Sequence, residues 1–366
     1  MGFLFSRLGR YIMVRVLSGL AVALIGVLAS ILLIDLVEQM RTIGARTDLS
    51  LLDAARLTLL KAPMLIEQTL PFVVLAGSMM ATIGLNRSSE LVAMRAAGVS
   101  AWRFLAPAAF IGALAGVAAV TALNPLGAHL YRAFETEKSD ALSSGGEGDH
   151  DNGVWIRQGD PEGQVVIHAD DVDPSGATLL QATFIFFEVR QDTLRFTRRI
   201  RAAEAELKPG FWQLREIVEA TPGGRPVRQP NLAIPTTLDP SELINRFVNP
   251  ATLSFWALPH FINEARAAGF APTRYELKQQ SLLAFPLLLA AMAGLGAAFS
   301  LQLQRLGNLA QWGAGGVGIG LFLFFYSQLA GAFAMTQTVP AVVAAWSAPF
   351  AGSFIALALV AFLEDG

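Results

Sequence analysis

The stretch LFLFFYSQLAGAFAMTQTVPAVVAAWSAPF, residues 321–350, belongs to a run between Leu306 and Leu363 that contains no charged side chain. Polar residues and a proline from Thr336 to Pro340 divide this run into two lengths, and each can cross the ~30 Å hydrocarbon core of a bilayer as a helix. Long core helices of soluble proteins have a polar face at the 3.6-residue period, and this run has none. The stretch therefore predicts a membrane protein.

Four other uncharged runs bring the number of predicted spans to six. Each is near or above the roughly 20 residues that a transmembrane helix needs, and they cover residues 16–34, 68–86, 104–128 and 279–304. Three spans therefore fall in residues 1–128 and three in residues 271–366, with a polar segment, residues 129–270, between them.

Basic residues are concentrated in the connections on one side of the predicted membrane. The N-terminal segment has three arginines and no acid, the connection between the second and third spans has three arginines and one acid, and Arg305 follows the fourth span. Cytoplasmic segments carry such an excess of lysine and arginine. We therefore expect both termini in the cytoplasm and residues 129–270 on the opposite side of the membrane.

The segment 129–270 has the composition of a soluble domain and the patterning of β-strands. Turn sequences, among them Lys-Pro-Gly at residues 208–210, separate short apolar or alternating runs, which predict strands over residues 154–156, 164–168, 177–189, 193–207, 211–220 and 227–234. This spacing predicts an all-β sandwich, jelly roll or open barrel. The run 177–189 is apolar on both faces, so its strand should be central. Four arginines crowd the next strand, either as a solvated face or as contacts to an anionic ligand: Arg195, Arg198, Arg199 and Arg201.

Several kinds of chemistry are excluded by composition. Cysteine is absent, and the four histidines are not paired at ligand spacing, so no metal site is expected. None of the four lysines follows a glycine as in a phosphate-binding loop, so we expect no ATP hydrolysis and no bound cofactor in this chain. Nothing in the sequence indicates a nucleic-acid partner.

The sequence NRSSELVAMRAAGVS, residues 86–100, joins the second and third spans on the predicted cytoplasmic side. It predicts a short helix over residues 87–99, capped by Asn86 or Ser88, with Glu90 in its first turn and Gly98 at its end. Leu91, Met94, Arg95 and Gly98 would share one face. Two interpretations remain open: a cytoplasmic motor grips this helix, or the helix lies on the membrane surface without a partner.

This segment resembles the coupling helix of the lipopolysaccharide-export permeases of the LptF/LptG type, whose pattern is roughly S-E-L-x-x-x-x-A-x-G. Four further segments are similar to the same family: DLVEQMR at residues 35–41, which looks like the LptG version, GVWIR at 153–157, RYEL at 274–277 and VPAVVAAWSAP at 339–349. Together they cover nearly the whole chain.

The resemblance implies a multi-pass subunit of the bacterial inner membrane that extracts lipopolysaccharide from the outer leaflet. It implies an inserted periplasmic jelly roll that hands the lipid to a bridge of LptA type, with a single-span protein of LptC type nearby. It also implies pairing with a sister permease of LptF type and docking on an LptB-type ATPase dimer, which holds the ATP and magnesium. The residues expected to couple to that ATPase are Ser89, Glu90, Leu91, Met94, Arg95 and Gly98.

Lipopolysaccharide carries anionic phosphates above acyl chains, so its site needs basic residues at the outer headgroup level and an apolar wall beneath. By position in the spans and by resemblance, the candidate headgroup residues are Arg41, Glu38, Arg46, Lys61, Arg274 and Lys278. Candidates for the wall are Leu28, Leu32, Phe322 and Phe325. The alternatives are that the basic residues snorkel to phospholipid phosphates and that the apolar residues simply face lipid. Asp35 and Thr42 stand where members of the family can be basic.

A stand-alone secondary transporter, or a membrane anchor that displays a β domain, is the alternative function. Secondary transporters usually have ionisable residues deep in their spans. Apart from Glu67, near the outer end of the second span, the predicted spans have none. An anchor needs one span rather than six. Both alternatives therefore fit the sequence less well than a permease does.

Overall fold

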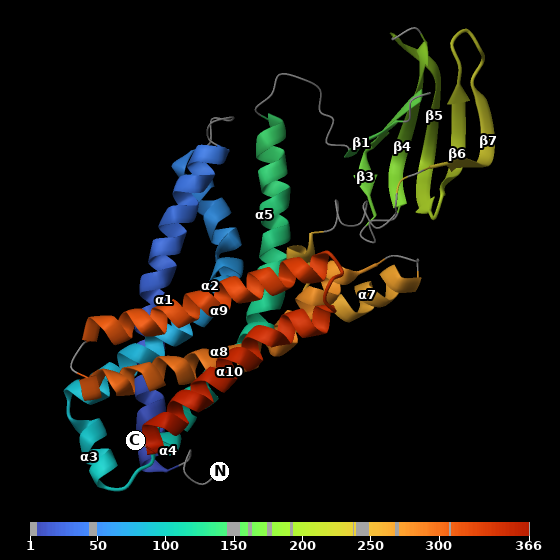
Figure 1. Cartoon of the computed structure of the whole chain (residues 1–366). Coiled ribbons are helices and arrows are strands. Elements are labelled where there is room, and N and C mark those ends of the chain that lie inside the picture. Colours follow the sequence, from blue (N-terminus) through green and yellow to red (C-terminus); the bar gives the residue numbers. More distant parts are fainter. Residues whose placement is uncertain are drawn as a thin grey trace. The chain divides into compact units, whose positions relative to one another are not determined.

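The computed structural model describes residues 6–43, 50–144, 154–159, 163–173, 178–190, 193–236, 238, 249–267, 271–306 and 309–365. These fall into two compact units (Figure 1). The helical unit comprises Met1–Leu142, Ala251–Leu258 and Thr273–Gly366, and the β unit comprises Ser143–Pro250 and Pro259–Pro272.

Within the described residues, six helical segments are long and apolar enough to cross a membrane, as the sequence predicted. The third of them is built from three consecutive elements, which include a single π-helical turn, η1. The helices of the helical unit are α1 (Arg7–Thr42), α2 (Leu51–Arg87), α3 (Glu90–Ala96), α4 (Ala101–Ala118), η1 (Ala119–Leu123), α5 (Asn124–Ser144), α8 (Thr273–Leu306), α9 (Leu309–Met335) and α10 (Ala341–Asp365).

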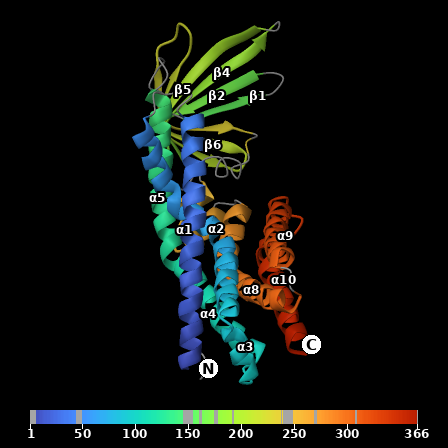
Figure 2. The ribbon, with the colours of Figure 1, turned by 90° about the vertical axis from the view of Figure 1, so that its left-hand side faces the viewer.

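Helix α8 lies at the centre of the helical unit, where it packs against α2, α4, α9 and α10. Of its most apolar window 67% of the residues are buried, against 11% for α1 and 17% for α9. Figure 2 shows α1 and α9 on opposite sides of the unit, with α2 and α8 between them. The apolar faces of α1 and α9 are therefore exposed in the isolated chain.

Close packing of α4 on α8 depends on glycines in α4. A Cβ atom added at Gly112 would lie 2.5 Å from the backbone oxygen of Leu289, and one added at Gly116 would lie 2.5 Å from the Cα atom of Pro286. Small residues allow helices in a membrane to approach until their backbones are in contact. The register of α4 on α8 is thereby fixed.

The third spanning segment continues as a helix beyond the apolar run from which it was predicted. The polar module was expected from residue 129, but α5 continues as a helix to Ser144. Beyond the apolar run, Phe134 packs with Ile43 and Leu57 in a small hydrophobic cluster, and the guanidinium of Arg56 lies 2.7 Å from a carboxylate oxygen of Glu137. These tertiary contacts stabilise a segment whose own composition is polar.

The β unit contains an antiparallel sheet, which confirms the all-β insertion between the third and fourth spans. Among the described residues the strand order is β1-β2-β4-β5-β6-β7, with the short β3 paired to β4. β4 is central, as its two apolar faces predicted. The strands are β1 (Val154–Gly159), β2 (Gly163–Ala169), β3 (Asp171–Val172), β4 (Thr178–Arg190), β5 (Thr193–Lys208), β6 (Phe211–Ala220) and β7 (Val227–Pro235). Three elements were not predicted: β3, η2 (Pro250–Thr252) and α7 (Leu258–Ala267).

The pairing of three neighbouring strands is interrupted at the same level of the sheet. Gln181 of β4, Ala203 of β5 and Glu216 of β6 drop out of the pairing, while the register continues unchanged on both sides of them. Gln181 and Glu216 have φ angles of 50° and 49°, which are uncommon for residues other than glycine. Alternation of buried positions is reset there, so that Leu179 and Ala182 are both buried. We call Gln181, Ala203 and Glu216 the kink line.

Candidate functional site

A partly buried ion pair joins the C-terminal part of α1 to the N-terminal part of α2. The Nζ atom of Lys61 lies 2.5 Å from Oδ1 of Asp35, which is 7% exposed. The side chain of Gln39 donates a hydrogen bond of 3.2 Å to the other carboxylate oxygen. Nζ of Lys61 also lies 5.8 Å from the ring centroid of Phe134. In this structure the charge of Lys61 is therefore balanced within the chain.

The other headgroup candidates near this pair are on the last turns of α1. Glu38 and Arg41 are exposed there, less than two helical turns beyond Asp35. Arg46 lies outside the described residues. Arg41 and Lys61 thus lie toward the same end of the helical unit, and Lys61 is paired there with the acid Asp35 of α1.

Lys278 and Arg274 occupy the first two turns of α8. Nζ of Lys278 donates a hydrogen bond of 2.8 Å to the backbone oxygen of Leu253, and Arg274 is partly buried. On α2, the carboxylate of Glu67 accepts two hydrogen bonds, of 2.9 and 3.2 Å, from the side-chain amide of Asn124. Through its bond to Leu253, Lys278 contacts residues 251–258, the segment by which the chain returns toward α8.

Asn124 also holds that returning chain. Its Oδ1 accepts a 2.8 Å hydrogen bond from the backbone N–H of Phe255, and Nε of Arg132 donates one of 2.8 Å to the oxygen of Thr252. The π-helical turn η1 ends directly before Asn124, and such turns occur frequently at functional sites. These contacts fix residues 251–258 onto the helical unit.

Replacing Asn124 with alanine is expected to destabilise this junction, because the Glu67 carboxylate and the Phe255 N–H both lose their partner. Leaving such partly buried groups unpaired costs roughly 1 kcal/mol or more. Thermal unfolding of the purified protein in detergent should show a melting temperature lower by several degrees. Thr136→Ala on the exposed face of α5 is the control and should leave the melting temperature unchanged; an equal loss in both variants would contradict a specific role for Asn124.

The apolar candidates lie on two separate helices. Leu28 and Leu32 are partly buried on α1, whereas Phe322 and Phe325 on α9 are 61% and 65% exposed. Because α2 and α8 lie between α1 and α9 (Figure 2), one chain does not bring these four side chains into a single wall.

Helix α3 is shorter than expected and begins differently. It runs from Glu90 to Ala96, follows α2 after a turn, and its N-cap residue Ser89 has a φ angle of 58° without a side-chain cap bond. The hydroxyl of Ser88 instead donates to backbone oxygens of α2, so the expected capping by Asn86 or Ser88 is wrong. Gly98 has a φ angle of 78°, which suits glycine, and its N–H donates to the oxygen of Arg95.

The side chains of α3 face two directions. Leu91 is 2% exposed within the main apolar core, and Met94 packs against the same core. Arg95 and Val92 are exposed. Leu91 and Met94 therefore anchor α3 to the helical unit, and the surface that a partner can reach carries Glu90, Val92 and Arg95.

Glu90 is connected to the N-terminal part of α1. A guanidinium nitrogen of Arg15 lies 3.5 Å from Oε1 of Glu90, and Nε of Arg15 donates a 2.9 Å hydrogen bond to the hydroxyl of Tyr11. Hydrogen bonds from Tyr11 and Ser88 lower the pKa of Glu90 below its ordinary value. The carboxylate is ionised at neutral pH, and its pairing with Arg15 connects α3 to α1.

The geometry thus combines six spans, an all-β insertion between the third and fourth, and a short anchored helix between the second and third. A family model described as "Lipopolysaccharide export system permease LptF/LptG" matches residues 10–361. The chain belongs to the LptF/LptG family. It is also similar to the lipopolysaccharide export system permease protein LptG of Haemophilus influenzae, with 26% identity over 341 residues, 92% of this chain and 93% of that protein.

Membership in the LptF/LptG family confirms the resemblance seen in the sequence, and the similarity to LptG agrees with the LptG-like segment 35–41. This member is a multi-pass permease of the inner membrane and a non-catalytic component of a transporter. Sequence reasoning missed three features of its site: the Asp35–Lys61 pair, the Asn124 junction and the contact of Glu90 with α1. The only signal for the Asp35–Lys61 pair was an acid, Asp35, close to the basic residue Arg41. The Asn124 junction and the contact of Glu90 with α1 join positions far apart in the sequence.

Proposed function

We propose that this permease is the membrane subunit of an ATP-driven transporter that extracts lipopolysaccharide from the outer leaflet of the inner membrane and passes it to a periplasmic bridge. The observation that carries the proposal is the pairing of two sites at opposite ends of α1. Basic residues near Asp35 lie at one end, and the anchored helix α3, with Glu90 facing Arg15, lies at the other. The excess of arginine near α3 supports a cytoplasmic location for that end and a periplasmic location for the β unit.

The headgroup site in this proposal works by exchange of partners. Asp35 balances Lys61 in the chain without lipid. A phosphate of lipid A that reaches Lys61 replaces the Asp35 carboxylate, and the exposed Arg41 supplies a second positive charge. Lysine is a common phosphate ligand because its three N–H donors and point charge tolerate many geometries. The partner exchange makes binding reversible, as transport requires.

The acyl chains in this proposal occupy a cavity between two permeases. Helices α1 and α9 expose large apolar side chains on opposite sides of the chain, including Val22 and Ile25 on α1 and Phe322 and Phe325 on α9. A sister permease of LptF type that packs against both sides brings its own helices opposite them. Leu28, Leu32, Phe322 and Phe325 would then belong to walls that two subunits complete.

The remaining partners follow from the same division of labour. A cytoplasmic ATPase dimer of LptB type holds ATP and magnesium and contacts Glu90, Val92 and Arg95, while Leu91 and Met94 pass the movement to the core. Proteins of LptC and LptA type receive the lipid from the β unit. Affinity purification of the tagged permease in mild detergent tests this: an ATPase and a second six-span protein should copurify, and their absence would contradict the proposal.

Arg41→Glu is expected to reduce photocrosslinking of lipopolysaccharide to α1 by about fivefold, because each basic residue near an anionic headgroup contributes about 1 kcal/mol. Crosslinking yield per permease in vesicles is the measurement. The control is the same charge reversal outside the proposed site, Arg266→Glu on α7. Arg132→Glu is a poorer control because it would also break the contact with Thr252. Equal crosslinking in wild type and Arg41→Glu would remove Arg41 from the site.

A further inference from the structure

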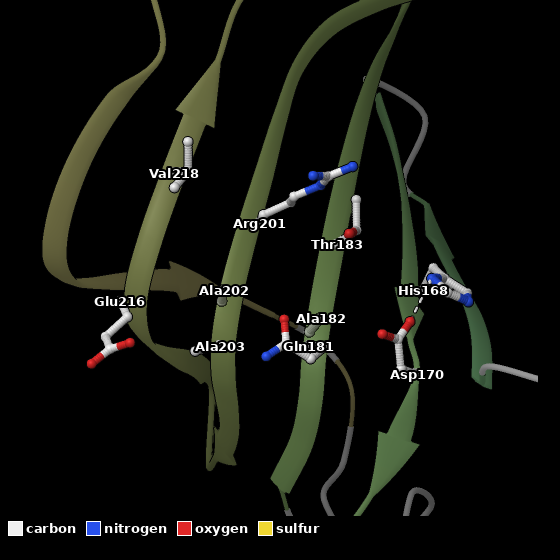
Figure 3. Close-up of a pocket in the computed structure, with 10 residues that line it drawn as sticks. All are labelled: His168, Asp170, Gln181, Ala182, Thr183, Arg201, Ala202, Ala203, Glu216 and Val218. Atoms are coloured by element: carbon white, nitrogen blue, oxygen red, sulfur yellow. Dashed lines mark ion pairs between the residues drawn. The ribbon is translucent and has the colours of Figure 1, made fainter.

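The kink line borders a hollow on the face of the sheet opposite the apolar core of the β unit. Its volume is about 490 Å³, within the range of roughly 300–1,000 Å³ that is usual for small-molecule sites. Side chains from β2, β4, β5 and β6 and from the residue after β2 line it (Figure 3). The lining residues are His168, Asp170, Gln181, Ala182, Thr183, Arg201, Ala202, Ala203, Glu216 and Val218.

The backbone at this hollow is held in an unusual conformation. Gln181 and Glu216 have positive φ angles, which cost free energy for residues with a side chain and cluster at binding sites. The pairs Gln181–Ala203 and Ala203–Glu216 are missing at this level, while the register of the three strands continues on both sides. The hollow lies at this interruption, and all three residues of the kink line belong to its lining.

A continuous row of side chains crosses the sheet beside the kink line. Trp155 pairs with His168, His168 with Thr183, Thr183 with Arg201, and Arg201 with Val218. Trp155 is 51% exposed, and its ring centroid lies 4.5 Å from that of His168. The row therefore offers an exposed aromatic surface at one end and hydroxyl and guanidinium groups in the middle.

The composition of the hollow selects the class of ligand. Arg201 donates hydrogen bonds, Asp170 and Glu216 accept them, and Gln181 and Thr183 do both. Two carboxylates disfavour a phosphate ion, and the polar lining disfavours an acyl chain. A sugar has hydroxyls that donate and accept together, and an apolar C–H face that packs on an aromatic ring.

We propose that this hollow binds a sugar residue of a polar oligosaccharide headgroup. This headgroup is the core oligosaccharide of lipopolysaccharide, an assignment that rests on the proposed function. It is held on the β unit while the acyl chains are bound elsewhere. Arg201 and Asp170 bind the hydroxyls, and Trp155 packs against the sugar ring at the rim. The OB-fold is another antiparallel β domain in which a strand face helps to bind oligosaccharides.

The test uses the full-length permease in detergent and, as probe, core oligosaccharide freed of lipid A by mild acid hydrolysis, with titration calorimetry as the readout. Wild type should bind the probe saturably. Arg201→Ala and Asp170→Asn should each weaken binding about tenfold, as expected for a hydrogen bond to a charged group. Trp155→Ala should weaken it as well.

Arg199→Ala is the matched control, because Arg199 is exposed on the same strand and face, two residues from Arg201, but does not line the hollow. Its affinity should stay within about twofold of wild type. Absence of binding, equal binding by Arg201→Ala, or displacement by inorganic phosphate would each overturn the sugar site. Crosslinking of lipid A to α1 is measured in parallel on the wild-type permease. If lipid A does not crosslink but the oligosaccharide still binds, the proposed function is contradicted and the sugar site is retained.

Discussion

Replacing Glu90 with alanine is expected to weaken association of the permease with its ATPase about 30-fold. Glu90 is ionised at neutral pH, and hydrogen bonds from Tyr11 and Ser88 lower its pKa further, so a basic group of the ATPase would meet a full negative charge. Losing a hydrogen bond to a charged group costs about 1.5–3 kcal/mol, and each 1.4 kcal/mol is a factor of ten in affinity. Copurified ATPase per permease measures the loss, and lipid release per ATP measures coupling.

Arg15→Ala separates contact with the ATPase from contact within the chain. It removes the 3.5 Å pair with Glu90 but leaves the Glu90 carboxylate in place, and an ion pair exposed to solvent contributes little to stability. Association with the ATPase should therefore change much less than in Glu90→Ala. If the two variants lost the same affinity, Glu90 would act by positioning α3 on α1 and not by touching the partner.

Lys61 is expected to dominate recognition of the lipid A phosphates. Simple removal of Lys61 would leave Asp35 buried without its partner, which is strongly destabilising, so the useful pair is Asp35→Asn and the double variant Asp35→Asn with Lys61→Met. Asp35→Asn releases Lys61 and should strengthen binding. The double variant should bind lipid A about 30-fold more weakly than Asp35→Asn, since a charge-assisted hydrogen bond is lost.

Binding of fluorescent lipid A to the purified permease is the measurement, and dephosphorylated lipid A is the control ligand. The difference between the two variants should vanish with that ligand, because the phosphate is the group that Lys61 contacts. A difference that persists without phosphate would mean that Lys61 shapes the apolar wall. Unchanged binding in Asp35→Asn would show that the Asp35–Lys61 pair does not compete with the lipid.

The spans and strands were predictable because each is specified by a local pattern. An uncharged run longer than a bilayer is thick has few soluble alternatives, and the turn sequences on both sides of β6 predicted its range, Phe211–Ala220, without change. Failures arose where tertiary contacts override composition. The polar helix α5 continues to Ser144 because Phe134 packs with Leu57 and Glu137 pairs with Arg56. The kink line also escaped prediction, since a strand pattern carries no sign of a positive φ angle at glutamine or glutamate.

The candidate site was predicted as a set of residues and not as an arrangement. Helical spacing grouped Leu91, Met94 and Arg95 on one face, whereas the structure turns Leu91 and Met94 into the core and leaves Arg95 exposed. Phe322 and Leu32 were expected in one wall, but they belong to α9 and α1, which lie on opposite sides of the helical unit (Figure 2). Spacing along one element says which side chains share a face but not which neighbour that face meets.

By itself, the sequence determined that this chain crosses the membrane six times, carries an all-β insertion and belongs with lipopolysaccharide-export permeases, because hydrophobic length, strand alternation and short motifs are properties of contiguous residues. Only the tertiary structure decided that Lys61 is balanced by Asp35, that Asn124 holds the chain returning to α8, and that a polar hollow opens beside Gln181 and Glu216. Each of these depends on groups that folding brings together from distant parts of the chain, and their distances are set by packing.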